Sequence, residues 1–186
     1  MTLYHLLRMG TWMVDSDHTR VRFSVRLLGL SIVEGSFREV HGSTTFDPRD
    51  PASARGVARI GAASIDTGDE RIDADHRGPE VFDAERHPYI VFVSRSVTPA
   101  GDAGHRVVGD LTIRGITRRM AFDLEYRGIG VDPQGRRHAG MTLSGVVDRA
   151  DFGLTRSLTL RRLVGTRVDL SIEARLVEQV DAPKVA

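Results

Sequence analysis

The amino-acid sequence predicts an all-β protein, an antiparallel barrel of about eight strands with one or two short helices inserted near residues 68–88. Three observations lead to this prediction. Apolar and polar residues alternate with a period of two in several segments, turn residues separate these segments, and only one long stretch lacks alternation. A chain of 186 residues is also long enough to form one domain around a continuous core.

The clearest strands lie near the start, in the second half and close to the end of the chain, in 20–26, 119–127 and 167–176. In each segment one face is apolar and the other is rich in charged residues, which is typical of a strand with one buried face. The apolar positions are Val21, Phe23, Val25, Met120, Phe122, Leu124, Tyr126, Val168, Leu170, Ile172, Ala174 and Leu176.

Five further segments alternate less regularly and complete the predicted set of strands. Turn sequences such as Asp47-Pro48 and Asp132-Pro133-Gln134-Gly135 separate them, because these residues favour tight turns. The five segments are 37–46, 57–65, 89–97, 106–114 and 138–147.

One segment, 68–88, interrupts the strands. It reads GDERIDADHRGPEVFDAERHP, is acidic and compatible with helix, and we expect its helices to end before Pro88. Sequential antiparallel strands of this number favour closure, because a barrel removes the two unpaired edges of an open sheet. We expect the barrel domain to span 12–178, with an N-terminal extension at 1–11 and a frayed tail at 179–186. An eight-stranded barrel is either filled by its own side chains or holds one small ligand, and the pattern alone leaves both open.

Composition excludes several classes of protein. The absence of cysteine excludes disulfides, thiolate metal sites and cysteine nucleophiles. No nucleotide-binding or serine-nucleophile motif occurs, and the net charge of +1 gives no broad field toward nucleic acid. The first residues lack the apolar run of a secretory signal, and no stretch approaches the roughly 20 apolar residues of a membrane span. We therefore expect a cytoplasmic protein without a membrane span or a nucleic-acid partner.

Acidic residues and one histidine gather within 66–76. Carboxylate oxygens suit hard cations, and two carboxylates can also act as an acid and a base. The spacing matches no EF-hand loop and no zinc signature, however, and acidic side chains are favoured where a helix begins. The sequence favours a solvated, helix-capping face. The residues concerned are Asp66, Asp69, Glu70, Asp73, Asp75 and His76.

Six short motifs in order, over about 12–176, resemble the YceI-like family, lipocalin-like barrel proteins that bind polyisoprenoids. Each motif is weak alone, but their order over one domain is specific for the fold. The chain departs from the family pattern at three places. Leu27 stands where the family commonly has a histidine after its first strand, and Asp75-His76 stands where the family usually has His-Leu. Val81 replaces the first of two usual aromatic residues. The matching motifs are Trp12-Met13-Val14-Asp15, Gly35-Ser36-Phe37, Ala63-Ser64-Ile65-Asp66-Thr67, Phe82-Asp83-Ala84 with Pro88 and Phe92, Gly109-Asp110-Leu111-Thr112-Ile113-Arg114-Gly115, and Arg149-Ala150-Asp151-Phe152-Gly153-Leu154.

The resemblance implies a binding protein without a cofactor, and not an enzyme. Its ligand would be a long-chain isoprenoid lipid, such as a polyprenyl phosphate or an isoprenoid quinone, held in the barrel. We expect the small residues Gly61, Ala62, Gly109 and Gly145 to leave room where the backbone approaches the ligand. The predicted barrel wall consists of Phe23, Val25, Ile90, Phe92, Leu111, Ile113, Met120, Phe122, Leu124, Met141 and Leu143.

A second set of residues is expected at the mouth of the barrel or in a cap over it. Within this set, the apolar cluster Leu27, Leu28, Leu30 and Ile32 would form either a cap or lipid entrance, or a short helical turn that plugs one end of the barrel. Because members of the family often pair, a homodimer contact is a third interpretation of the apolar cluster that begins at Leu27. Arg149 is a candidate contact for an anionic head group, through its fork of donors, while Asp151 is expected to accept backbone hydrogen bonds at a turn. The mouth set is Leu27, Leu28, Leu30, Ile32, Phe37, Phe82 and Phe152.

Two alternatives stay open at this point. One is a metal-dependent enzyme that uses the acidic segment 66–76. The other is a barrel with a solid core that acts as an interaction module.

Overall fold

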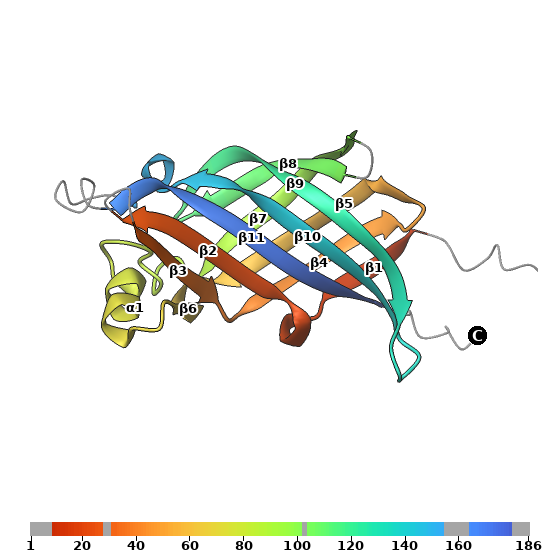
Figure 1. Ribbon diagram of the computed structural model, residues 1–186, viewed down its shortest axis with the longest axis horizontal. Helices are drawn as coiled ribbons and strands as arrows, with labels where there is room; N and C mark the ends of the chain where they lie inside the picture. Colours follow the sequence, from red (N-terminus) through yellow and green to blue (C-terminus); the bar gives the residue numbers. More distant parts are fainter. Residues whose placement is uncertain (1–8, 28–30, 102–103, 155–163, 180–186) are drawn as a thin grey trace, which may run out of the picture.

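The computed structural model describes residues 9–27, 31–101, 104–154 and 164–179. Its centre is a closed antiparallel barrel, in which each strand pairs with the next and the first strand pairs with the last (Figure 1). This confirms the predicted all-β barrel of about eight strands, but the ring contains a strand at 10–14 that was not among the predicted segments, and the predicted strand 20–26 lies beside the ring. In order around the ring the strands are β1 (Gly10–Val14), β4 (Val40–Asp47), β5 (Asp50–Gly61), β7 (Tyr89–Ala100), β8 (Gly104–Ile113), β9 (Ile116–Val131), β10 (Arg137–Asp148) and β11 (Val164–Glu178).

The last strand, β11, is shared by two parts of the sheet. Its final residues pair with β1, in the register Val14 to Leu176, while its earlier residues pair with β2 (Arg20–Leu27), in the register Phe23 to Leu170. The change of partner occurs at the 3₁₀-helix η2 (Ser16–His18), which separates β1 from β2.

Three strands extend the wall beyond the closed ring. β2 pairs with β3 (Ser31–Phe37), and β3 pairs with the short β6 (Ile65–Asp66). Among the described residues the sheet therefore has eleven strands. Figure 1 shows this extension next to α1, at the end of the barrel away from β1.

The predicted helical insertion contains one α-helix within the described residues, α1 (Glu70–Arg77). Asp69 caps its first turn by accepting a hydrogen bond from the backbone N–H of Arg71, and the helix ends at Arg77, with Gly78 as its C-cap directly before Pro79. The chain then folds back, with the N–H of Phe82 donating to the carbonyl of His76. No helix in the described part of the chain is long and apolar enough to cross a bilayer.

Three groups of buried apolar side chains fill parts of the interior. The largest lies at the α1 end and centres on Phe152, which is 0% exposed. A second lies around Trp12, where β1 pairs with the last residues of β11, and a third lies between β7, β8 and β9 around Val107. We refer to these as the α1-end cluster, the Trp12 cluster and the Val107 cluster.

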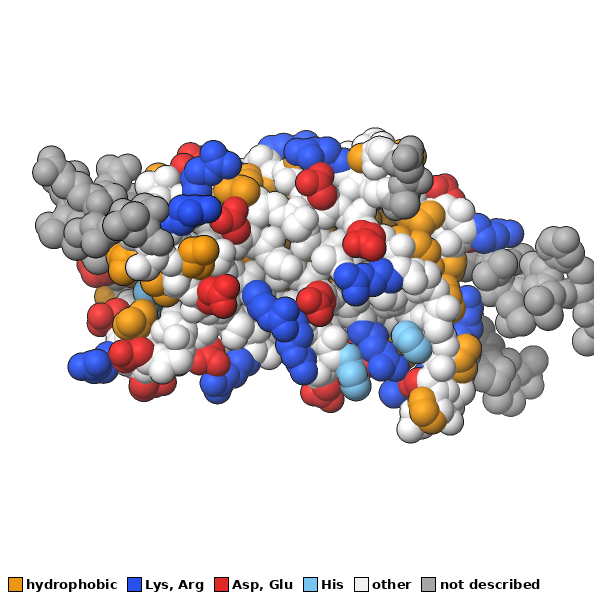
Figure 2. All heavy atoms as spheres, viewed as in Figure 1, with side chains coloured by type: hydrophobic (Ala, Val, Ile, Leu, Met, Phe, Trp, Pro, Cys, Tyr) orange, Lys and Arg blue, Asp and Glu red, His pale blue; other side chains and the backbone are white. Residues whose placement is uncertain are grey.

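The outer face of the barrel is polar. In the view of Figure 2, arginine and acidic side chains are interspersed over the surface, without a broad area of one sign. Asp110 on β8 accepts hydrogen bonds from Arg95 on β7 and Arg119 on β9, and the bond from Arg95 lowers the pKa of its carboxyl. Such cross-strand pairs follow from the alternation, because charged residues on neighbouring strands share the outer face.

Phe152 gives a direct test of the α1-end cluster. We expect Phe152→Ala to lower the free energy of unfolding by about 3–5 kcal/mol, because it opens a cavity among fully buried apolar neighbours. Denaturant unfolding of wild type and variant measures this difference. A loss below about 1 kcal/mol would contradict the placement of this ring in the core.

Candidate functional site

The inner face of the barrel is a continuous apolar surface. Residues directly opposite each other in an antiparallel pair share a face, so the register assigns each side chain to the inside or the outside. Leu143, for example, lies opposite both Leu124 and Ile172. The structure places all eleven predicted wall residues on this inner face.

The inner face also includes residues of β11 outside the predicted wall. Val168, Leu170 and Ile172 lie opposite Val25, Phe23 and Val21, between β10 and β2. The signal for them was present in the sequence, because they alternate with Arg167, Asp169 and Ser171 as regularly as any strand in the chain.

Burial varies along the inner face. Of the predicted wall, the five residues Ile90, Leu111, Ile113, Phe122 and Leu124 are buried in the α1-end and Val107 clusters. Two more residues of the predicted wall, Phe92 on β7 and Met120 on β9, are half-buried. Other inner-face residues that stay half-buried although they point into the barrel gather along β2, β10 and β11. They include Phe23, Val25, Met141, Leu143, Val168, Leu170 and Ile172. The interior therefore retains accessible apolar surface along these three strands.

Polar and aromatic groups close the end of the interior near β1. Trp12 is 0% exposed and packs against Phe46 at 5.2 Å between ring centroids. The guanidinium of Arg137 lies 5.6 Å above the Trp12 ring and forms an ion pair with Glu178 at 2.7 Å. Burial raises the pKa of the neighbouring Tyr126 hydroxyl, and the charge of Arg137 opposes this shift.

The small residues predicted to leave room for a ligand have no open space beside them. An ideal Cβ on Gly109 would lie 2.4 Å from Cζ of Phe92, and one on Gly145 would lie 2.5 Å from Cδ1 of Phe122. The space beside both glycines is thus taken by phenylalanine rings of the barrel itself. A Cβ on Gly61 would meet Glu39, and Ala62 is buried in the α1-end cluster, so the expectation was wrong for these residues.

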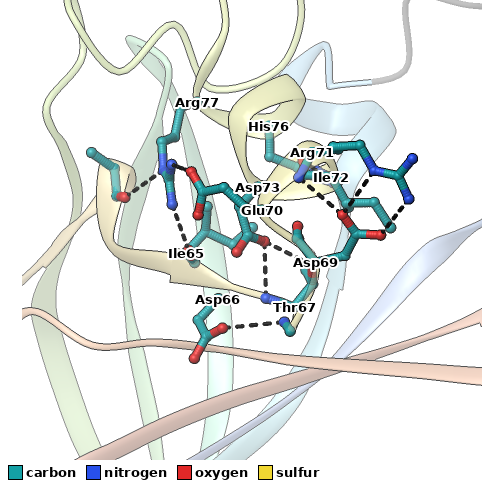
Figure 3. Close-up of polar contacts among 12 residues, drawn as sticks. Ile65, Asp66, Thr67, Asp69, Glu70, Arg71, Ile72, Asp73, His76 and Arg77 are labelled. Atoms are coloured by element: carbon teal, nitrogen blue, oxygen red, sulfur yellow. Dashed lines mark hydrogen bonds and ion pairs between the residues drawn. The ribbon is translucent and has the colours of Figure 1, made fainter.

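The acidic segment forms a local network of caps and turns (Figure 3). Asp73 is buried, and its Oδ1 accepts hydrogen bonds from the backbone N–H and the hydroxyl of Thr67, at 2.9 and 2.7 Å. Glu70 pairs with Arg77 at 2.6 Å, and a ring nitrogen of His76 lies 2.7 Å from the carbonyl oxygen of Ile72.

Arginines hold two further carboxylates of this segment, Asp66 and Asp69. A hydrogen bond from Arg38 lowers the pKa of Asp66, and one from Arg71 lowers the pKa of Asp69. Among the residues that the structure describes, no three histidine or acidic side chains come together in a way that could hold a metal ion. Asp69 caps the helix as expected, whereas the expectation of a solvated face was wrong for Asp73, which is buried and accepts hydrogen bonds from Thr67.

Comparison with known proteins agrees with this architecture. The model of the YceI-like domain matches residues 12–176. The chain belongs to the YceI-like family. A UPF0312 protein of Serratia proteamaculans is 34% identical over 144 residues, which cover 77% of this chain and 74% of that protein, and one of Yersinia pestis is 33% identical over the same length.

Solved structures show the same fold. Burkholderia cenocepacia BcnA is 23% identical, with a TM-score of 0.78 over 87% of this chain and 98% of that one. The Campylobacter jejuni YceI protein is 25% identical, with a TM-score of 0.73 over 81% and 88%. A polyisoprenoid binding domain from Saccharophagus degradans is 14% identical, with a TM-score of 0.69 over 92% and 100%.

The residues that the YceI-like resemblance assigned to the mouth fall into separate groups. Phe82 and Phe152 are buried in the α1-end cluster, so neither is an exposed cap, and Phe37 packs against the same cluster. Ile32 lies opposite Arg26 on the outer face and is 59% exposed. Leu27 is half-buried at the end of β2, whereas Leu28 and Leu30 lie outside the described residues.

Arg149, the candidate head-group contact of this YceI-like chain, is half-buried at the start of the 3₁₀-helix η4 (Arg149–Phe152). The turn is held by Asp148, which accepts hydrogen bonds from the backbone N–H of Ala150 and the hydroxyl of Thr166. The expectation that Asp151 accepts backbone hydrogen bonds here was wrong, because Asp151 is exposed and Asp148 accepts the hydrogen bond from the backbone N–H of Ala150 instead.

Two substitutions of Asp73 distinguish a structural role from metal binding. We expect Asp73→Ala to lower the free energy of unfolding by about 1–3 kcal/mol, because it leaves the N–H of Thr67 without an acceptor. Asp73→Asn keeps an acceptor oxygen and removes the charge, so the loss should be smaller.

Calorimetric titration with Mg²⁺, Mn²⁺ and Zn²⁺ completes this test. The structural role predicts no binding heat in the wild type or in either variant. Saturable binding of one cation to the wild type that Asp73→Asn abolishes would contradict it and favour the metal-dependent alternative.

Proposed function

We propose that this YceI-like protein binds a long-chain isoprenoid lipid, of the polyprenyl phosphate or isoprenoid quinone type, inside its barrel. It acts as a binding protein for transport, storage or presentation of that lipid, and not as an enzyme. The observation that carries this proposal is the accessible apolar surface along β2, β10 and β11, within a barrel whose interior is packed by side chains at either end.

The chemistry of the inner face suits a prenyl chain. Each buried CH₂ group contributes about 0.8 kcal/mol, so a long hydrocarbon gains affinity from apolar contact without precisely placed polar partners. Phe23, Leu143 and Ile172 offer such contact and carry no polar side-chain atoms. The Saccharophagus degradans domain of the same fold is described as polyisoprenoid binding, which supports the proposal at the level of the fold.

The single tryptophan of the chain reports on the interior directly. Trp12 is fully buried at one end of the barrel, so a quinone bound inside should quench its fluorescence. We expect saturable quenching on titration with a long-chain isoprenoid quinone. A short-chain quinone with the same head group is the control for collisional quenching, and it should quench far less at equal concentration.

A pair of neighbouring substitutions on β11 tests where the ligand binds. Ile172 points inward and is half-buried, whereas Ser171 points outward and is exposed. We expect Ile172→Asn to weaken quinone binding about tenfold, a loss of about 1.4 kcal/mol of binding free energy. Ser171→Asn should bind as the wild type does.

Equal affinities for the two variants would contradict binding inside the barrel. Failure of the wild type to bind any long-chain quinone or polyprenyl phosphate would contradict the proposed function itself. A barrel with a solid core, serving as an interaction module, would then explain the fold better.

A further inference from the structure

Three phenylalanine rings on the inner face lie across glycines of neighbouring strands. An ideal Cβ built on each glycine would come within 2.3–2.5 Å of a ring carbon, far closer than two carbon atoms can approach. A side chain at these positions would therefore displace the ring. The three aromatic-on-glycine pairs are Phe23 on Gly35, Phe92 on Gly109 and Phe122 on Gly145.

Backbone conformation does not explain these glycines. None of the three has a positive φ, so each backbone conformation is open to any residue. What a larger residue would lack at these positions is space, because the ring, and at Gly109 also the carbonyl oxygen of Val93, already occupies it. The glycines therefore serve the placement of the rings.

The placement of the rings affects the width of the interior. A phenylalanine ring can lie over a glycine because no Cβ is in its way, whereas a larger residue at the same position would displace the ring from that strand. Phe23 lies directly opposite Gly35, and Phe37 packs beside it at 5.5 Å between ring centroids. Phe23 also packs against the α1-end cluster, so a Cβ on Gly35 would push its ring away from the wall, toward the interior of the barrel.

We propose that the aromatic-on-glycine pairs set the clear width of the barrel interior and thereby its capacity for a flexible prenyl chain. This inference rests on the proposed function and names residues that determine ligand specificity within it. Phe23 is half-buried on β2, so its ring forms part of the accessible apolar surface, and Phe92 on β7 is half-buried on the same inner face. Phe122 is buried and meets Phe92 edge to face at 5.3 Å between ring centroids, a contact that helps to hold the Phe92 ring in place.

Gly35 is the best position for a test. All three of the nearest atoms to its ideal Cβ belong to the ring of Phe23, so Gly35→Ala acts on that ring. At Gly109 the ideal Cβ would also lie 2.5 Å from the carbonyl oxygen of Val93, and a substitution there would strain the backbone.

The experiment compares quinone binding by four proteins, with fluorescence of Trp12 as the readout. We expect Gly35→Ala to weaken binding of a long-chain isoprenoid quinone about tenfold, since the displaced ring narrows the interior. Adding Phe23→Leu to this variant removes the ring and should restore the affinity. Gly140→Ala is the matched control, because Gly140 lies on the outer face of β10 and its nearest neighbour atom, Cβ of Arg127, is 3.4 Å from the ideal Cβ.

Phe23→Leu alone provides a second test that does not depend on the folding of Gly35→Ala. It widens the interior, so a bulkier apolar ligand such as a sterol should bind more tightly than to the wild type. Denaturant unfolding of each variant verifies that it is folded.

The outcomes separate this inference from the proposed function. If the wild type binds the quinone and Gly35→Ala binds it equally well, the inference is wrong although the proposed function stands. Weaker binding by Gly35→Ala that Phe23→Leu fails to restore would also overturn it, because the ring would not be the cause. Absence of binding by the wild type would overturn the proposed function instead.

Discussion

Closure of the sheet on β11 is the constraint on which the rest of this structure depends. The strand pairs with β10 along one edge, and along the other it pairs first with β2 and then with β1. Because side chains alternate along a strand, this pairing directs Val168, Leu170 and Ile172 into the barrel and their charged neighbours to the outside. The apolar interior and the polar surface both follow from that single arrangement.

The segment around α1 connects to this interior through aromatic rings. Phe37 lies between Phe23 and Phe82, at 5.5 and 5.9 Å between centroids, and Phe82 lies 6.3 Å from the ring of His76 on α1. The buried carboxylate of Asp73 fixes the turn before the helix at Thr67. The acidic residues therefore position α1 against the wall, and the rings complete the α1-end cluster.

Regular alternation made β2, β9 and β11 predictable from the sequence. The strand β3 was mostly missed, because Ile32 and Val33 are adjacent and Gly35 lacks a side chain, so its segment shows no alternation. Its continuous pairing with β2, from Val21 opposite Phe37 to Leu27 opposite Ser31, and its short pairing with β6 make it a strand.

The candidate site was predictable in its residue types but not in its contacts. Alternation identifies which residues face inward, yet it cannot say which of them are covered by segments distant in sequence. Phe82 and Phe152 were expected at the mouth and lie in the core, because the chain after α1 and the helix η4 fold onto the same end of the barrel. The phenylalanine rings that cover Gly35, Gly109 and Gly145 were likewise invisible, because they depend on register between strands.

A native mass spectrum tests the central claim, that the barrel holds a long isoprenoid, most directly. The protein is purified from its native host under non-denaturing conditions, measured, and then denatured so that any released molecule can be identified. The account predicts a bound species with the mass of a polyprenyl lipid, or a mass shift after incubation with isoprenoid quinones or polyprenyl phosphates. An unliganded mass that stays unchanged after both incubations would contradict it.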